Sequence, residues 1–399
     1  MTRKLRFGVV AFAASALFLA ACGSDAATTA DTTVAAEAVE TTPAETTPAE
    51  TTPAETTPAA AETTVAAAAS GEQVGVSLIL KTLSNPFFVS MQKDAEAKAK
   101  ELNVKLTTSA GKEDGDSATQ IAAIEAAIAN GDKGILITPS TDDVVPALDK
   151  ARAAGLLVIA LDTPPNPASS VDITFATNNY EAGQLIGQWT NGQLAAAGNK
   201  KAVIAMLDLF TDNVVSVDTG RDQGFLNGMG IVAAEDKSGN GKEPATGKYA
   251  AGGDYEIVCH EPTNGNVDGG KSAIEACLAK NPDINVIYTI NEPAAQGAYD
   301  VMKAGGNDKD LLIVSVDGGC KPGLELVASG VIGATAQQYP GQMAAKGMQA
   351  IVDLASGKPK PAVTPGLDFF NTGVSLVTDK AVSGVKSISV ADGQKICWG

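Results

Sequence analysis

Polar side chains and two aromatic rings follow a series of short apolar segments that are typical of buried strands. Ligands of parallel α/β sheets bind beyond the carboxyl ends of the strands, so a site should form at these positions. The first segment ends at Lys81 and is followed by Asn85, Phe87 and Phe88. The candidates at the ends of later segments, together with an arginine that opens a helix, are Thr138, Asp162, Asn179, Arg221, Asn291, Asp317 and Gln338.

This set of side chains suits a small polyhydroxylated ligand. Carboxylates, amides and a guanidinium group can bond vicinal hydroxyls in pairs, because hydroxyls both donate and accept. The apolar C–H face of a sugar lies flat on aromatic rings such as Phe87 and Phe88. Two adjacent phenylalanines could belong to the core instead, but their place beside Asn85 favours a binding wall. Asn291 and Asp317 could cap the helices that follow, and a capping side chain can still contact a ligand.

Histidine, which serves in many catalytic and metal sites, is scarce in this chain. His260 is the only histidine and adjoins a cysteine, which argues against a histidine-based triad and a His/Cys metal site. The residue types alone leave the paired carboxylates of a glycosidase possible. However, every carboxylate pair at the strand ends is accompanied by amides and an arginine, so none of them suggests glycoside hydrolysis. The net charge of −17 argues against nucleic acid as a partner. We therefore expect no enzyme activity, no cofactor and no metal.

Ten short apolar segments alternate with helical patterns from Val74 onward. Between them, Ile121, Ile124 and Ile128 recur at helical spacing. Such alternation predicts parallel sheets covered on both faces, and ten strands suit two domains of about five each. The predicted strands are VGVSLIL, VKLTTS, GILIT, LLVIALD, DITFAT, KAVIAML, YEIVC, NVIYTI, LLIVSVD and VIGATAQ.

Residues 1–21 have the pattern of a secretory signal peptide. Basic residues precede an apolar run that is too short to span a bilayer as a helix. The run ends in LAAC at Cys22, which resembles the lipobox of bacterial lipoproteins and implies diacylglyceryl attachment to Cys22. An ordinary signal peptide with an incidental cysteine is the alternative. We expect a protein that is lipid-anchored to the cell membrane at its extracytoplasmic face.

Residues 22–73 differ in composition from the rest of the chain. They contain the repeat TTPAETTPAETTPAETTPA and no apolar period. Such a segment cannot bury enough apolar surface to offset the entropy of ordering. We expect a disordered Thr/Pro/Ala/Glu-rich tether between the membrane and the folded part.

Four cysteines remain once Cys22 is set aside, which is an even number in an oxidising compartment. They allow three disulfide pairings. Cys259 lies at a strand end and Cys277 in the following helix, which favours Cys259–Cys277 with Cys320–Cys397. Metal binding is the alternative, but the chain has no CxxC spacing.

Residues 74–399 resemble the ribose-type periplasmic sugar-binding proteins, the type I substrate-binding components of ABC importers. The segment TLSNPFFVS, from Thr82 to Ser90, is nearly a copy of the first strand–helix turn of that family. Further matches, in order, are PSTDDVVPALDKARAAGLLVIALDT, GRDQGF, NEPAAQGAY, SVDGG and GATAQQYP. The resemblance implies an α/β fold of two doubly wound, Rossmann-like lobes with parallel central sheets, joined by a three-strand hinge. The implied lobes are residues 74–177 plus 339–374 and residues 178–338 plus 375–399.

The same resemblance divides the candidate sugar-binding side chains between the lobes. The residues that the first lobe would supply are Lys81, Asn85, Phe87, Phe88, Thr138 and Asp162. Those that would close from the second lobe are Arg221, Asn291, Asp317 and Gln338, with Asn179 near the hinge.

Two differences from the ribose-binding pattern argue against ribose itself as the ligand. The loop after the Cys259 strand lacks the third aromatic residue of the family and offers Asn264 and Asn266. Asp162 is followed by Thr163, where ribose binders carry an arginine. The LDT and CWG segments and the four cysteines look more like the fructose-type branch, so fructose or a similar ketose or furanose is the expected ligand.

The function that the resemblance implies is capture of a fructose-like or ribose-like monosaccharide in the cleft between the lobes. The protein, as a monomer, would deliver the sugar to an ABC permease with its cytoplasmic ATPase. The alternative is a sugar or autoinducer receptor of the same fold that presents its occupancy to a membrane sensor.

Overall fold

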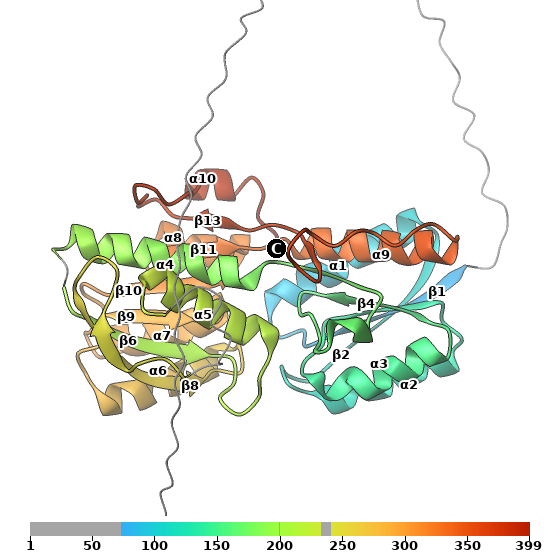
Figure 1. Ribbon diagram of the computed structural model, residues 1–399, viewed down its shortest axis with the longest axis horizontal. Helices are drawn as coiled ribbons and strands as arrows, with labels where there is room; N and C mark the ends of the chain where they lie inside the picture. The colour runs from blue at the N-terminus through green and yellow to red at the C-terminus, as the bar shows by residue number, and fades with distance from the viewer. Residues whose placement is uncertain (1–72, 199, 233–240) are drawn as a thin grey trace, which may run out of the picture. The chain divides into compact units, whose positions relative to one another are not determined.

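The computed structural model describes residues 73–198, 200–232 and 241–399 (Figure 1). The expected signal peptide, the expected lipidation site at Cys22 and nearly all of the expected tether lie outside these residues. Within the described ranges, no helix combines the length and the apolar character that crossing a membrane requires.

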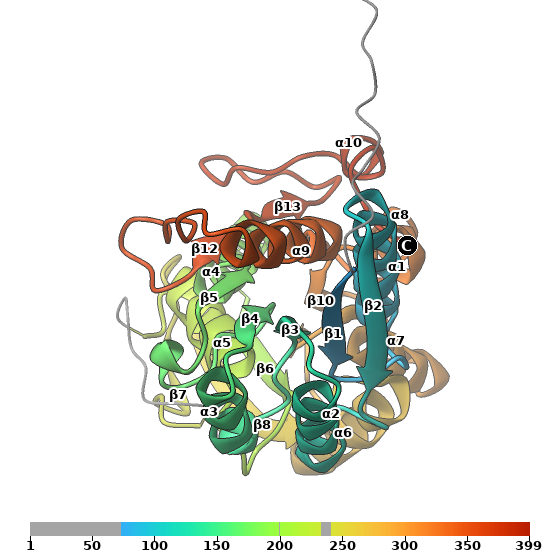
Figure 2. The ribbon, with the colours of Figure 1, turned by 90° about the vertical axis from the view of Figure 1, so that its right-hand side faces the viewer.

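The first of two sheets has six strands in the order β12-β5-β4-β3-β1-β2, and each neighbouring pair is parallel. Its strands are β1 (Val74–Leu80), β2 (Val104–Ala110), β3 (Gly134–Ile137), β4 (Leu157–Leu161), β5 (Ile173–Ala176) and β12 (Phe370–Asn371). Leu78 and Ile79 belong to different core clusters, because successive strand residues point to opposite faces. The helices on one face are α1 (Pro86–Glu101) and α9 (Pro340–Ala355), and those on the other are α2 (Ser117–Ala129) and α3 (Val145–Ala153) (Figures 1 and 2).

The second sheet has seven strands in the order β13-β11-β10-β9-β6-β8-β7. Its strands are β6 (Ala202–Asp208), β7 (Thr246–Lys248), β8 (Asp254–Pro262), β9 (Val286–Thr289), β10 (Leu312–Asp317), β11 (Ala334–Gln337) and β13 (Ser375–Val377). The pairs β7–β8 and β11–β13 are antiparallel and the others are parallel. The covering helices are α4 (Asn179–Ala196) and α5 (Ser216–Met229) on one face, and α6 (Val267–Lys280) and α7 (Glu292–Ala304) on the other.

Several short elements connect the longer helices and strands. They are the 3₁₀ turns Asp142–Val144 and Ala168–Ser170, the π-helical turn Cys320–Leu324, and the helices α8 (Glu325–Ala328) and α10 (Val390–Gly393). The sequence predicts ten of the thirteen labelled strands and misses β7, β12 and β13, because runs of two or three residues show no periodicity.

The two sheets form two α/β lobes, and the chain passes between them three times. The crossings lie between β5 and α4, between β11 and α9, and between β12 and β13. The first and third crossings are bonded to each other, since Thr177 Oγ1 donates to Gly373 O at 3.3 Å and Asn178 N to Asn371 Oδ1 at 3.1 Å. The three crossings are the only connections of the described chain between the two sheets, and domain closure in two-lobed proteins takes place in a few such residues.

Both disulfides favoured from the sequence are present, and both lie in the second lobe. Cys259–Cys277 joins β8 to α6, and Cys320–Cys397 joins the π-helical turn to the segment after α10. Each cross-link restricts the unfolded chain and so stabilises the fold, by roughly 3 kcal/mol for the shorter loop and about 4.5 kcal/mol for the longer one on the chain-entropy model.

Glycines set the close packing of α4 against α5, which carries Arg221. A Cβ atom at Gly183 would overlap the carbonyl oxygen of Arg221, and one at Gly224 would overlap that of Tyr180. The two helix backbones touch here, so the position of Arg221 depends on residues that have no side chain.

Replacing Gly224 with alanine should therefore lower the free energy of unfolding by about 1 to 3 kcal/mol, because a well-packed backbone contact must shift. Urea denaturation measures the change. Gly305→Ala is the matched control, since φ is −78° and a Cβ atom there would come no closer than 3.5 Å to another heavy atom. Equal destabilisation by both variants would contradict this account of the helix pair.

Candidate ligand-binding site

Residues at the carboxyl ends of strands from both sheets enclose a small cavity between the lobes. Its volume is about 20 Å³, which is room for little more than one water molecule. The lobes are thus closed, and a larger ligand can enter only when they part. The lining residues are Lys81, Asn85, Phe87, Phe88, Asp114, Asp162, Leu209, Val217, Arg221, Ile290, Asn291 and Asp317.

In the first lobe, a buried lysine lies between two carboxylates. Lys81 Nζ is 3.7 Å from Asp162 Oδ2 and 4.0 Å from Asp114 Oδ1, and it lies 6.0 Å from the centre of the Phe88 ring. The backbone N–H of Lys81 donates to Thr138 Oγ1 at 2.8 Å. Thr138, which does not line the cavity, therefore holds the end of β1 in place.

In the second lobe, Arg221 is fixed on three sides. Its Nε donates to Asn179 Oδ1 at 2.7 Å, its Nη1 donates to Ile290 O at 2.7 Å, and Nη1 is 3.7 Å from Asp317 Oδ1. Gln338 Nε2 donates to the same carboxylate oxygen at 2.8 Å. Asn179 and Gln338 lie outside the cavity lining and orient the two charged groups that face it.

The two asparagines of the cavity also cap helices. Asn85 Oδ1 accepts from Phe87 N at 2.9 Å at the start of α1, and Asn291 Oδ1 accepts from Ala294 N at 3.1 Å at the start of α7. Asn291 Nδ2 donates to Gly265 O at 2.9 Å. Asn291 therefore caps the helix that follows it, as the sequence allowed, and it also lines the cavity.

The two phenylalanines are buried in the core of the first lobe and also line the cavity. Phe87 and Phe88 are 2% and 4% exposed, and their rings meet edge to face with centroids 5.2 Å apart. Both interpretations of the sequence are therefore correct, since these side chains belong to the core and also form part of the cavity wall. The burial fixes the rings rigidly at the edge of the cavity.

Two site carboxylates have backbone conformations that are unusual for residues other than glycine. Asp162 has φ of 65° and Asp317 has φ of 118°. Such residues cost on the order of 1 to 3 kcal/mol each and persist only where the surroundings hold them. Here Asp162 N donates to Phe175 O at 2.9 Å, and Gln338 N donates to Asp317 O at 2.9 Å. The strain therefore lies at the two carboxylates that face the cavity from opposite lobes.

Four lining residues were not among the candidates predicted from the sequence. Asp114 follows β2, and the strand-end rule would have found it had it been applied to that strand. Val217 lies one helical turn before Arg221 on α5. Leu209 and Ile290 follow β6 and β9, but an apolar side chain carries no chemical signal of a site.

Burial raises the pKa of two acids that line the cavity, Asp114 and Asp317. Burial raises the pKa of Asp317 to about 7. The positive charge of Arg221 opposes this increase, and the negative charge of Asp162 adds to it. The pKa of Asp114 is also raised by burial, and the Lys81 ammonium opposes this increase. The closed cavity thus favours a protonated Asp317, whereas water in an open cleft would favour its charged form.

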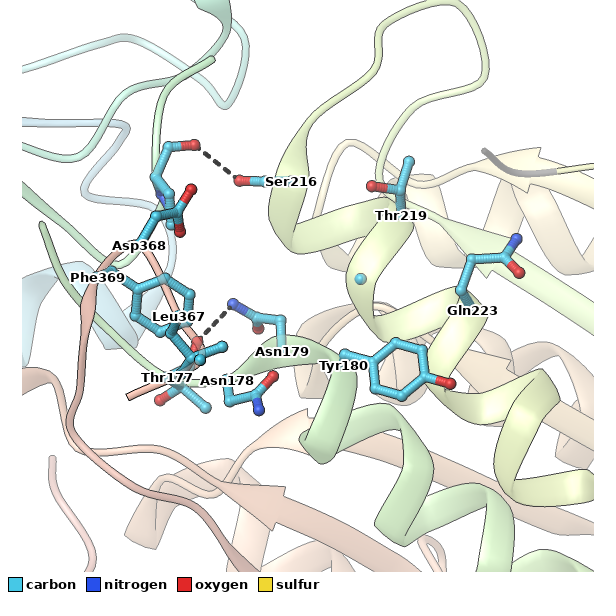
Figure 3. Close-up of a pocket in the computed structure, with 13 residues that line it drawn as sticks. Thr177, Asn178, Asn179, Tyr180, Ser216, Thr219, Gln223, Leu367, Asp368 and Phe369 are labelled. Atoms are coloured by element: carbon cyan, nitrogen blue, oxygen red, sulfur yellow. Dashed lines mark hydrogen bonds between the residues drawn. The ribbon is translucent and has the colours of Figure 1, made fainter. Parts of the chain in front are cut away.

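A larger pocket of about 850 Å³ lies beside the first crossing (Figure 3). Asn179 Nδ2 donates there to Thr177 O, and Ser216 Oγ of the second lobe donates to Pro164 O of the first. Its lining contains none of the charged pairs of the smaller cavity. We therefore assign the ligand site to the smaller cavity at the strand ends.

A second cluster of ionisable groups surrounds the single histidine. Asp208, Asp222 and His260 are close enough to hold a metal ion. However, His260 Nδ1 is 2.8 Å from Asp208 Oδ2, and Nε2 is 2.6 Å from Glu243 Oε1. Burial alone would lower the pKa of His260, but the hydrogen bond to Glu243 and the charge of Asp222 raise it. The raised pKa favours the charged imidazolium form of His260 beside these acids.

The fold and the enclosed strand-end cavity define a two-lobed binding protein. The chain belongs to the periplasmic binding protein family, whose domain matches residues 76–359. This is a family of binding proteins and not of enzymes, as the sequence predicts.

Similar curated proteins cover most of the chain. The D-ribose/D-allose-binding protein of Pseudomonas aeruginosa is 26% identical over 321 residues, which are 78% of this chain and 91% of that protein. The ribose import binding protein RbsB of Escherichia coli is 25% identical over 307 residues, or 77% and 93% of the two chains. A solute-binding protein of Agrobacterium vitis with bound D-fucose has a TM-score of 0.65 at 23% identity and covers 81% of this chain and 99% of its own. These comparisons confirm the family and the fold expected from the sequence.

The raised pKa of Asp317 predicts a pH-dependent stability. Between pH 3.8, the ordinary pKa of an aspartate, and about pH 7, the folded protein retains a proton that the unfolded chain releases, so its stability falls as the pH rises. The slope of this one group approaches about 1.4 kcal/mol per pH unit. Asp317→Asn cannot titrate and should lose less stability over this interval, as measured by denaturant unfolding. The exposed Asp283→Asn is the control, and parallel curves for wild type and Asp317→Asn would refute the prediction.

Proposed function

We propose that this chain is the extracytoplasmic solute-binding component of an ABC importer, and that it captures a monosaccharide between its lobes. Membership of the binding-protein family and relatives named for ribose and allose support the proposal. The observation that carries it is the cavity itself, where carboxylates, cations and amides from both lobes meet beside two rings.

The geometry suggests a division of roles. Sugar hydroxyls would donate to the carboxylate of Asp162 and accept from Lys81 and Arg221, because carboxylates only accept and cations only donate. Asp317 would accept from a hydroxyl when charged and could donate to one when protonated. The Phe88 ring would contact the C–H face of the sugar. A ligand that bonds both lobes does so only when they are closed, so its binding energy shifts the population toward closure, as in other periplasmic binding proteins.

The ligand class that we propose is a ketose or furanose of the fructose type, with ribose-like sugars as the nearest competitors. Thr163 stands beside Asp162 and donates to Asp162 Oδ2 at 2.7 Å. A short hydroxyl at this position leaves more room than the arginine expected of ribose binders, which supports a bulkier ring substituent.

The remaining parts of the proposal concern the cellular setting. We take residues 74–177 plus 339–374 and residues 178–338 plus 375–399 as the two moving lobes. Cys22 would carry the lipid and residues 22–73 would tether the lobes to the membrane. The closed monomer would then deliver its sugar to a membrane permease that a cytoplasmic ATPase drives.

Titration calorimetry with fructose, ribose, allose and myo-inositol tests the proposal, with binding of at least one sugar expected at one site per chain. Asp162→Asn should weaken that binding roughly 10-fold to 100-fold, since hydrogen bonds to charged groups contribute about 1.5 to 3 kcal/mol. Asparagine tolerates the positive φ of this position.

Asp149→Asn on the exposed face of α3 is the matched control and should bind as the wild type does. Absence of binding across a wider panel of pentoses, hexoses and polyols would overturn the proposed function. Unchanged affinity in Asp162→Asn would remove that carboxylate from the site.

A further inference from the structure

A tryptophan near the end of the described chain contacts both lobes at once. The Trp398 ring meets Phe87 of the first lobe edge to face, with centroids 5.4 Å apart and planes at 87°. It packs against the core of that lobe. Its Nε1 donates to Asp317 O of the second lobe at 3.2 Å. Both partners line the ligand cavity, whereas Trp398 does not.

The residues around Trp398 belong to the second lobe. Cys397 is disulfide-bonded to Cys320, and Cys320 N donates to Trp398 O at 2.8 Å. Gly319 leaves room for the indole, because a Cβ atom there would lie 2.9 Å from Trp398 Cη2. The backbone of Trp398 is thus fixed to one lobe while its ring is seated on the other.

We infer that Trp398 is an interlobe latch, a positioning residue that raises the affinity of the sugar site, and this inference rests on the proposed function. The ring can contact Phe87 only when the lobes are closed. Opening would move the ring off the first lobe and into water, since the disulfide keeps its backbone on the second. The contact therefore favours closure, and any ligand that binds the closed form gains affinity.

The latch also fixes the two groups through which it acts. The edge-to-face contact restrains Phe87, which in turn meets Phe88 at the cavity. The bond from Nε1 to Asp317 O restrains a residue whose φ is 118°. Cys320–Cys397 makes this arrangement dependent on oxidation, because reduction frees the segment that carries the ring.

Affinity measurements on matched variants test the inference. Trp398→Ala should raise the Kd of the sugar that the wild type binds about 10-fold, because the closed state becomes less populated. Trp398→Phe should recover most of the loss, since a phenyl ring preserves the edge-to-face contact. Cys320→Ala/Cys397→Ala should resemble Trp398→Ala.

The other disulfide of the same lobe provides the control. Cys259→Ala/Cys277→Ala should lower the melting temperature yet keep the Kd within about twofold, because it leaves Trp398 tethered. A merely structural role for Trp398 predicts instead that affinity follows stability across all four variants, and that result would overturn the inference. If Trp398→Ala does not fold, Trp398→Phe and the two disulfide variants still decide between these outcomes.

Fluorescence gives a second readout that stability does not affect. The chain has two tryptophans, and Trp189 is buried in the core of the second lobe. In Trp189→Phe, saturating sugar should reduce acrylamide quenching of the emission from Trp398, and reduction of the disulfides should reverse the effect. Unchanged quenching in a variant that binds sugar overturns the latch alone. A wild type that binds no sugar overturns the proposed function, and the latch with it.

Discussion

Four ionisable side chains from two lobes are buried around one small cavity, and the closed arrangement depends on how they pair. Lys81 and Asp162 come from the first lobe and Arg221 and Asp317 from the second, and their side chains are at most 6% exposed. Burying a charge costs several kcal/mol unless a partner and hydrogen bonds compensate. Opening returns water to all four groups, so closure is a balance that a hydroxylated ligand can shift.

The scaffold makes this balance possible because it brings each charge to the cavity on a fixed backbone. Parallel strands place Asp162 and Asp317 at their carboxyl ends, and both carboxylates are held at positive φ. Close packing of α4 on α5 positions Arg221, whose Nε is bonded to Asn179. The site is rigid within each lobe, and its freedom lies in the crossings between them.

The sequence could predict the elements and most of the cavity, because both follow from local rules. Apolar runs separated by helices define parallel sheets, and the strand-end rule finds Asp162 and Asp317. It could not separate lining residues from supporting ones, since Thr138 and Gln338 obey the same rule yet lie behind the wall. Trp398 was missed as a neighbour of Phe87 because the two residues meet only through the packing of both lobes.

The most direct test of the account is the distance between the lobes as sugar is added. Spin labels at Glu125→Cys on α2 and Glu275→Cys on α6, two exposed positions on different lobes, would report it. The account predicts that a bound monosaccharide converts a broad distance distribution into one shorter distance, with half-conversion at the Kd, and that Arg221→Met prevents this. A distribution that stays the same while calorimetry shows saturation would contradict it.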